Sequence, residues 1–485
     1  MKLLLPFIFL LPLYGIAQNP ADEILRTRHW CFGFDTGLNT VDAPRLEFTQ
    51  SGPTVHTDAH DLGAEGHSTA STLQGMLIAY GGHGTGAWYD GQNDTIAGTE
   101  NTGGSADRIQ GSLILPVSNG VLDQYYIFRM KTDGPILEID LEYDFIEVEQ
   151  GSTDLFVSQG GSDILVESHV TEALCSVHKC DGNGFWMVAH AYESKNFLIY
   201  DVDSTGVGLH STFNFGEDVN QVQCVGKFSN DGTKFAFAAG RITVNGVLTP
   251  RLYLFEFDKL TGVASNSLAI QCPSHVNGMS FSPNNQLLYM STGTGNLVQY
   301  DVSVWDSLAI ETSRDFVWQS ATGAPFYLQL AMDGKIYGAQ GGAPQHSHIG
   351  YIENPDVVGS GCNYLHSAIY LNGSASGSGL PNFPESYFNT DPFAYPCLRD
   401  GLVDSNSRSL MKVYPIPAID FLTVEAIDPI NQVRLTDQLG KVVMEQILTG
   451  QQPRVNLNLR DIPPGMYFIA ISTSKEQIQS VITKL

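Results

Sequence analysis

The chain has 485 residues, of which 42% are hydrophobic and only 16% are charged. It is therefore long enough for a large buried core and for two or three domains. Acidic residues outnumber basic ones by 51 to 25, which gives a formal net charge of −26. This charge argues against binding to nucleic acid or to anionic lipid, because both require a basic surface.

The charge changes along the chain. Residues 401–485 hold eight acidic and eight basic side chains and only four of the 49 glycines, so the acidic excess lies in the first 400 residues. Two pieces of different composition are therefore joined near residue 400.

The N-terminus has the pattern of an export signal. Lys2 precedes an apolar run from Leu3 to Ile16, and Gly15 and Ala17 supply the small residues of a cleavage site. The run is too short and too rich in proline to span a bilayer. We predict a signal peptide over residues 1–17 and a secreted mature chain; the alternative is a buried N-terminal strand.

Seven cysteines are compatible with an oxidising compartment, and their odd number leaves at least one thiol free. Cys175 and Cys180 are close enough in sequence to pair across a bend. Cys362 and Cys397 are a second candidate pair, which would join the end of the large domain. Without a Cys-x-x-Cys motif, a cysteine metal site has little support.

The middle of the chain repeats a turn followed by two strands. The clearest turns begin at residues 181, 231, 284 and 333, and weaker copies begin near 75 and 124. A period of about 50 residues with short strands in each unit is typical of β-propellers. The Asp-Gly and Asn-Asn pairs at these turns favour the left-handed backbone of tight hairpins.

Counting residues 30–55 as a further unit, we predict an all-β fold with a seven-bladed β-propeller over residues 28–395. An extra hairpin is expected at Ile242–Thr249, turning at Asn245-Gly246. The alternative is a series of stacked β-sandwiches, in which strands recur every 8–12 residues without the longer period.

Several short motifs in this region are similar to those of a known group of propellers. They are Trp30–Gly33, Gly37-Leu38, Glu65-Gly66 and Leu380–Phe383, in that order. The region resembles the seven-bladed, WD-repeat-like propellers of surface and gliding-associated proteins in the Bacteroidetes. The resemblance implies surface display and does not imply a reaction.

The tail, residues 413–485, is predicted to be a small immunoglobulin-like β-sandwich of short strands. Apolar and polar residues alternate in Val455–Leu459. The other expected strands are Phe421–Val424, Gln432–Leu435, Val442–Val443, Met466–Ile471 and Ser480–Lys484. The alternative is an ordinary immunoglobulin-like module with no role in transport.

The tail resembles the type A C-terminal sorting domain of the type IX secretion system. Four motifs occur in the family's order: Tyr-Pro-x-Pro, Gly-Lys, Pro-Gly-x-Tyr and a final strand that contains lysine. Their residues are Tyr414, Pro415, Pro417, Gly440, Lys441, Pro464, Gly465, Tyr467 and Lys484. Ile416 stands where the family usually has asparagine.

The resemblance implies that the tail is a transport address. The type IX secretion machinery would recognise it at the outer membrane, a peptidase would remove it, and the body would be released or anchored to lipopolysaccharide. The small, polar residues 404–409 within the linker 396–412 suit such removal, because they are expected to be exposed.

Two runs of side chains are candidate metal sites. Strand alternation places His56, Asp58 and His60 on one face, where they could hold a transition ion. The run that contains Glu138, Asp140 and Glu142 is acidic at alternate positions and could bind Ca²⁺. The alternative for each is a solvated strand face or connection.

No catalytic set stands out in the sequence. There is no Gly-x-Ser-x-Gly motif, and 51 acidic residues make any chosen carboxylate pair uninformative. We therefore predict a non-enzymatic protein that binds a surface protein or glycan, with no cofactor other than a possible calcium ion. The alternative is an exported propeller enzyme, lactonase-like or glycan-degrading, with its active site on the axis.

Overall fold

The protein is described from a computed structural model, in which the chain folds into two compact units, Met1–Pro396 and Cys397–Leu485. The structure describes residues 23–484 except 34–41, 50, 83–86, 100–107, 118–123, 133–138, 149–154, 159, 245–246, 321–324, 342–345, 390–411, 415–417, 419–420, 426–428, 437–440, 449–451, 453, 461 and 474–476. The predicted signal peptide, most of the predicted linker and Cys397 lie outside these residues.

The described part of the first unit forms seven antiparallel sheets from strands that follow one another in the chain. The first three sheets contain β1 (His29–Cys31), β2 (Ala43–Thr49) and β3 (Gly52–Ala59); β4 (His67–Ser71), β5 (Leu77–Gly82) and β6 (Trp88–Asp90); and β7 (Ser112–Pro116), β8 (Gln124–Lys131), β9 (Asp140–Val148), β10 (Leu155–Val157) and β11 (Ile164–Glu167). In the third sheet both β10 and β11 pair with β9.

The next four sheets have four strands each, in simple meander order. They contain β12 (Cys175–His178), β13 (Phe185–His190), β14 (Ser194–Asp203) and β15 (Gly206–Val219); β16 (Cys224–Phe228), β17 (Lys234–Val244), β18 (Val247–Asp258) and β19 (Val263–Gln271); β20 (Val276–Phe281), β21 (Leu287–Thr292), β22 (Asn296–Asp301) and β23 (Asp315–Gln319); and β24 (Pro325–Leu330), β25 (Ile336–Gln340), β26 (His348–Ile352) and β27 (Tyr364–Tyr370). The predicted extra hairpin is confirmed as the shared extension of β17 and β18, where Val244 pairs with Val247.

The repeated turns adopt the left-handed backbone that their sequences predict. Gly182, Gly232, Asn285 and Gly334 have φ values of 73°, 70°, 58° and 78°. Each is followed by a strand that is the second of its sheet. The period of about 50 residues is therefore one sheet long.

Helical elements in the described residues are short. They are η1 (Ile24–Thr27), α2 (Ser307–Thr312), η2 (Gly359–Cys362) and η3 (Glu385–Phe388). None of the described helices has the length and apolar character needed to cross a membrane.

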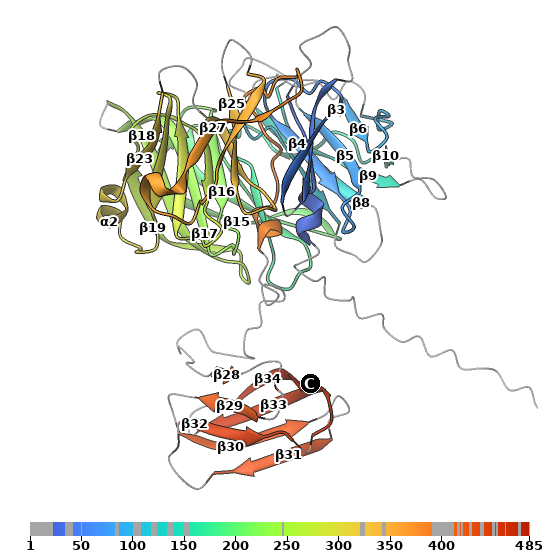
Figure 1. Ribbon diagram of the computed structural model, residues 1–485, viewed down its shortest axis with the longest axis vertical. Helices are drawn as coiled ribbons and strands as arrows, with labels where there is room; N and C mark the ends of the chain where they lie inside the picture. The colour runs from blue at the N-terminus through green and yellow to red at the C-terminus, as the bar shows by residue number, and fades with distance from the viewer. Residues whose placement is uncertain are drawn as a thin grey trace, which may run out of the picture. The chain divides into compact units, whose positions relative to one another are not determined.

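The sheets pack on one another in chain order and the first meets the last, so they form a ring; Figure 1 shows their strands, coloured from blue to orange along the chain. First strands pack side by side, β1 on β4, β4 on β7, β12 on β16, β16 on β20 and β20 on β24. The third and fourth sheets are joined by an ion pair of 3.0 Å between Arg108 and Glu172. The last sheet meets the first, because the rings of Tyr337 on β25 and Phe48 on β2 lie 5.1 Å apart.

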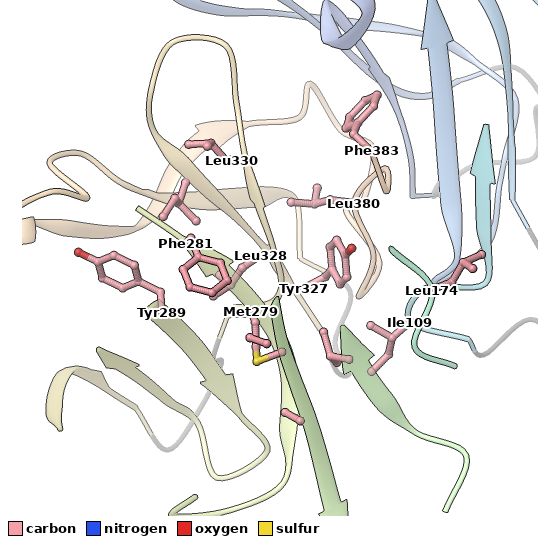
Figure 2. Packing of buried hydrophobic residues seen from close by; sticks show 14 of the residues in the cluster. Ile109, Leu174, Met279, Phe281, Tyr289, Tyr327, Leu328, Leu330, Leu380 and Phe383 are labelled. Carbon is pink, nitrogen blue, oxygen red and sulfur yellow. The ribbon is translucent and has the colours of Figure 1, made fainter. Parts of the chain in front are cut away.

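The largest cluster of buried apolar side chains draws on six of these sheets and on residues 371–388, which follow the last strand. Figure 2 shows Leu380 and Phe383 of this segment among side chains such as Tyr327, Ile109 and Leu174. Strands β13 and β21 are buried along their whole length, as their continuous apolar sequences predict for sheets covered on both faces.

Both predicted cysteine pairings are wrong. Cys175 and Cys362 are free and buried, whereas Cys180 is disulfide-bonded. Cys175 lies on β12 and packs into the apolar cluster between the fourth and fifth sheets, whereas Cys180 follows the end of the strand. The short sequence separation therefore did not bring the two thiols together.

The second unit has two sheets. One contains β28 (Lys412–Tyr414), β29 (Phe421–Glu425) and β32 (Arg454–Asn458); the other contains β31 (Val442–Ile447), β30 (Ile430–Thr436), β33 (Gly465–Thr473) and β34 (Gln477–Lys484), in that order. Both sheets supply side chains to one apolar core, including Leu422 and Leu457 from one sheet and Leu435 and Ile469 from the other. The six strands predicted in the tail are confirmed.

Candidate functional site

Residues 374–388, here called the central segment, run along the inner strands of the ring. Backbone N–H groups of Ser378 and Gly379 donate to the carbonyl oxygen of Ala64 at 2.7 and 2.9 Å, and that of Asn382 donates to His67 at 2.9 Å. The N–H of Tyr327 in turn donates to the carbonyl oxygen of Ser378 at 3.2 Å. The segment therefore replaces water as the hydrogen-bond partner of these inner residues.

The Asn382 side chain joins three sheets. Its Nδ2 donates to the carbonyl oxygens of Ser112 at 3.2 Å and Leu174 at 2.9 Å, and its Oδ1 accepts from the Tyr327 hydroxyl at 3.3 Å. Both amide protons are used, and Asn382 is only 2% exposed. An asparagine is suited to this position because it donates and accepts at once.

Gln110 makes a second connection across the ring. Its side chain donates to the carbonyl oxygen of Gly226 and accepts from the N–H of the same residue, both at 2.8 Å. The same Nε2 lies 3.4 Å from the Tyr327 hydroxyl. Gln110 is fully buried, so these bonds form away from solvent and help to fill the middle of the ring.

A buried ion pair holds the end of the central segment. The Lys227 ammonium on β16 donates to the Glu385 carboxylate and, at 2.7 Å, to Oε1 of Gln329 on β24. The side chains of Lys227 and Glu385 are 0% and 3% exposed. Burial, the largest single influence, lowers the pKa of Lys227, but Glu385 and Tyr327 outweigh it and leave the pKa above its ordinary value.

A buried histidine supports the same segment from the fourth sheet. The Ser386 hydroxyl accepts from the N–H of His178 at 2.9 Å and lies 2.8 Å from its Nδ1, and the Tyr387 ring meets the imidazole edge-on at 5.3 Å. Burial lowers the pKa of His178 to about 3, so the imidazole is neutral at neutral pH. It acts as a neutral hydrogen-bonding group.

The polar groups that converge at the middle of the ring thus bind the chain's own segment. Lys227, Gln329, Asn382 and Glu385 come from three regions of the chain and are each at most 2% exposed. Sequence reasoning missed Lys227, Gln329 and Glu385 because more than 50 residues separate each from its partners. Asn382 lies within the Leu380–Phe383 motif, and that motif was the sequence signal that could have identified it as a functional residue.

The first predicted metal set lies at the outer edge of the first sheet. Asp58 accepts two hydrogen bonds from Arg45, at 2.8 and 2.6 Å, and the His56 imidazole lies 3.4 Å from the Glu47 carboxylate. His60 lies beyond the end of β3, where its ring stacks on Tyr89 at 3.8 Å and its Nε2 lies 3.0 Å from the carbonyl oxygen of Asn93. The three side chains have separate partners.

The second predicted set lies on β9, with Glu138 outside the described residues. Asp140 accepts from the N–H of His169 at 3.2 Å, and Glu142 pairs with Arg129 at 3.1 Å. Asp144, on the same strand face, is fully buried against Arg129. The solvated face proposed as the alternative is therefore wrong for Glu142 and Asp144, because an arginine brings the acidic side chains inside.

In the part of the chain that the structure describes, no three His, Cys, Asp or Glu side chains are grouped so as to hold a metal ion. Arg45 and Arg129 lie beside the predicted ligands, and their positive charges would repel a metal cation bound there. Metal binding at either set, including calcium, remains a prediction from the sequence.

The sorting motifs lie at strand ends of the second unit. The Tyr467 hydroxyl donates to the carbonyl oxygen of Pro463 at 2.7 Å, which fastens the turn before β33. Gly465 at the start of β33 pairs with Lys484 at the end of β34, and Lys484 also bridges Ala418. Tyr414 ends β28, Pro464 immediately precedes β33, and Lys441 is exposed just before β31; Pro415, Pro417 and Gly440 lie outside the described residues.

Comparison with solved structures finds matches at low identity and low TM-score. A "putative 6-phosphogluconolactonase" from Bacteroides fragilis is 11% identical, with a TM-score of 0.38 over 73% of this chain and 96% of that chain. Sqt1 from Chaetomium thermophilum is 12% identical, with a TM-score of 0.34 over 74% and 82%. The Cps50 (Swd1) β-propeller domain of Myceliophteria thermophila is 10% identical, with a TM-score of 0.28 over 77% and 96%.

A search of curated proteins finds no match. Residues 412–484, however, match the family described as "Secretion system C-terminal sorting domain". The match spans β28 to β34, which is the whole described core of the second unit. This protein is therefore an all-β protein whose C-terminal unit is a type IX secretion sorting domain, and the domain indicates export by the type IX machinery.

Proposed function

We propose that this protein is an exported, non-enzymatic binding protein of the Bacteroidetes cell surface. Its body would be a seven-bladed β-propeller over residues 28–395, preceded by a signal peptide over residues 1–17. A linker over residues 396–412 would join it to an immunoglobulin-like sorting domain over residues 413–485.

The seven sheets of the described residues and their order support the propeller. Each sheet is built from consecutive strands, and five pairs of neighbouring sheets touch through their first strands. The contact between Phe48 and Tyr337 joins the first sheet to the last. Such an arrangement buries the faces of small sheets that are not stable alone.

The central segment is the observation that favours binding over axial catalysis. An axial active site needs side chains from several inner strands that converge on a space open to substrate. Here the converging groups, among them Lys227, Gln329 and Asn382, are bonded to the chain itself and are at most 2% exposed. A ligand would therefore bind to a face or an outer edge of the ring.

The sorting domain supports the address. After its removal, the body would be released or attached to lipopolysaccharide at the outer surface. Removal in a linker is compatible with folding of the body, because the central segment, which completes the ring, ends at residue 388, before the linker begins.

Surface fractionation tests the address. The full chain and a chain that ends at residue 411 are expressed in a bacterium with type IX secretion and detected on intact cells and in the medium. We expect the full chain outside and the shortened chain in the periplasm. The Ile447→Ala variant, at a residue 71% exposed on β31, is the matched control for the tail's surface. Display of the shortened chain outside would contradict the sorting role.

A binding assay tests the function itself. The exported protein is applied to a glycan array and to intact cells, and the same samples are assayed for released sugars and for lactone hydrolysis. We expect saturable binding without turnover. The Trp30→Ala variant, designed to disrupt the ring core, is the control for binding that needs the folded body. Turnover that is lost in this variant would overturn the non-enzymatic assignment.

A further inference from the structure

Within the residues that the structure describes, the first and last sheets of the ring share no strand. The described strands are β1, β2 and β3 in the first sheet and β24 to β27 in the last. A ring that is not closed by a shared strand depends on side-chain and loop contacts at the junction. The residues that make these contacts therefore decide whether the ring stays closed.

Much of the junction is made by residues that follow the last strand. The Trp30 ring lies 5.6 Å from Tyr337 of the last sheet and 6.0 Å from Phe383 of the central segment. The Ser374 hydroxyl donates to the carbonyl oxygen of Asp42 at 2.6 Å. The chain thus returns from the last sheet to the first.

Gly33 shows how closely the central segment passes the first sheet. A Cβ atom on Gly33 would lie 2.1 Å from the carbonyl oxygen of Ala375, and its φ of 69° is left-handed. Any other residue would clash with the segment's backbone and strain its own. The glycine in the Trp30–Gly33 motif is thereby explained.

At its other end the segment is held by the Lys227–Glu385 ion pair, here called the latch. Lys227 belongs to the fifth sheet, and Gln329, which donates to the same Glu385 carboxylate at 3.2 Å, belongs to the seventh. Because both charges are buried, removing one partner leaves the other unpaired in a dry site. The latch is therefore the point at which one substitution should release the segment.

We propose that the central segment, from here on called the strap, holds the ring closed, and that the Lys227–Glu385 latch holds the strap in place. When the latch breaks, residues 374–388 leave the middle of the ring and the first and last sheets separate, while the sheets between them stay folded. The strap follows the described strands of the ring in the chain. This proposal does not depend on the proposed function.

Hydrogen–deuterium exchange with mass spectrometry on the full chain tests the strap. In Lys227→Met, we expect residues 374–388, β1–β3 and β24–β27 to exchange ~100-fold faster, with β16–β23 changed far less. The double variant Lys227→Met/Glu385→Met should restore most of the protection, because it replaces the charged pair by apolar side chains.

Arg108→Met is the matched control. It breaks another buried ion pair, with Glu172, between the third and fourth sheets, where both side chains are 4% exposed. We expect its effect to centre on β7–β9 and β12. Equal acceleration of the strap in Arg108→Met and Lys227→Met would overturn the proposal, as would uniform acceleration of all sheets in Lys227→Met.

The unmodified protein gives a second test that does not require the variant to fold. Under mild denaturant, the strap, the first sheet and the last sheet should exchange as one unit before the fifth and sixth sheets do. Exchange of the strap only together with the fifth and sixth sheets would show that it does not open separately, and the proposal would fail.

Discussion

The ring and the sorting domain bury different kinds of side chain. The core of the sorting domain is apolar, and Lys484 at 7% exposure is the one charged or polar side chain buried in its described part. The ring buries polar groups at its centre, such as Lys227, Asn382 and Glu385, that bond across sheets. Two sheets that share one core need only two apolar faces, whereas a ring must also fill the space where its sheets converge.

The two units also differ in their content of histidine and tryptophan, the residues that can be used to measure their stability separately. All 13 histidines and all five tryptophans lie before residue 397, so none belongs to the sorting domain. Four of the histidines, at 29, 67, 178 and 190, are buried. Tryptophan fluorescence and acid sensitivity therefore distinguish the units.

Acidification should have the largest effect and should act on the ring. Burial lowers the pKa of His178 and His190 to about 3 and of His29 and His67 to about 4, against 6.5 for the free side chain. Because the unfolded chain binds protons that the folded ring cannot, stability is retained above pH 6.5 and is lost as the pH falls from there to about 3–4.

His178 alone would account for about 3 kcal/mol of that loss between pH 7.5 and 4. Urea unfolding followed by tryptophan fluorescence between pH 7.5 and 4 measures it. Protection factors of peptides from residues 412–484, which correct for the pH dependence of intrinsic exchange, should change much less over the same range. An equal loss of stability in both units would show that the buried histidines are not its cause.

The substitution Trp30→Ala should destabilise the ring by about 4 kcal/mol, because it removes a fully buried side chain from a packed core. Denaturant unfolding of the ring checks this value. Trp318→Ala, at a half-buried position on β23, should cost clearly less. Similar losses for the two variants would contradict the argument from burial.

In the sorting domain, Leu457→Ala should cost about 3 kcal/mol, because the side chain is 1% exposed between the two sheets. Exchange in peptides from residues 412–484 should accelerate while the fluorescence transition of the ring stays in place. Ile447→Ala is the exposed control. A shift of the ring transition in Leu457→Ala would show that the units do not unfold separately.

The smallest expected effect is that of Tyr467→Phe, which removes the hydrogen bond to the carbonyl oxygen of Pro463 and should cost about 1 kcal/mol. The same exchange measurement on the tail detects it. A loss as large as that of Leu457→Ala would mean that the hydroxyl has a further role in this turn.

Much of the fold could be predicted from local patterns. In the tail, the alternation in Val455–Leu459 gives buried Val455 and Leu457 between exposed neighbours, because side chains on a strand alternate faces. In the ring, Gly182 and Asn285 mark the repeated turns because few residues tolerate a left-handed backbone. These features depend on residues within a few positions of one another.

The candidate site could not be predicted in the same way. Lys227 and Glu385 are 158 positions apart, and Gln110 and Tyr327 are 217 apart. The sequence offers many lysines, glutamates and glutamines, and only closure of the ring selects which of them meet. The same reason explains the wrong cysteine pairings, since Cys175 and Cys180 are neighbours in the chain but have different surroundings.

The sequence by itself determined the all-β character, the repeat, and the identity of the tail as a sorting domain, because strand alternation, turn residues and short motifs act locally. The tertiary structure alone decided what occupies the middle of the ring. A buried charge is tolerated only where a partner neutralises it, and for Lys227 that partner is supplied by a segment that returns after the last sheet.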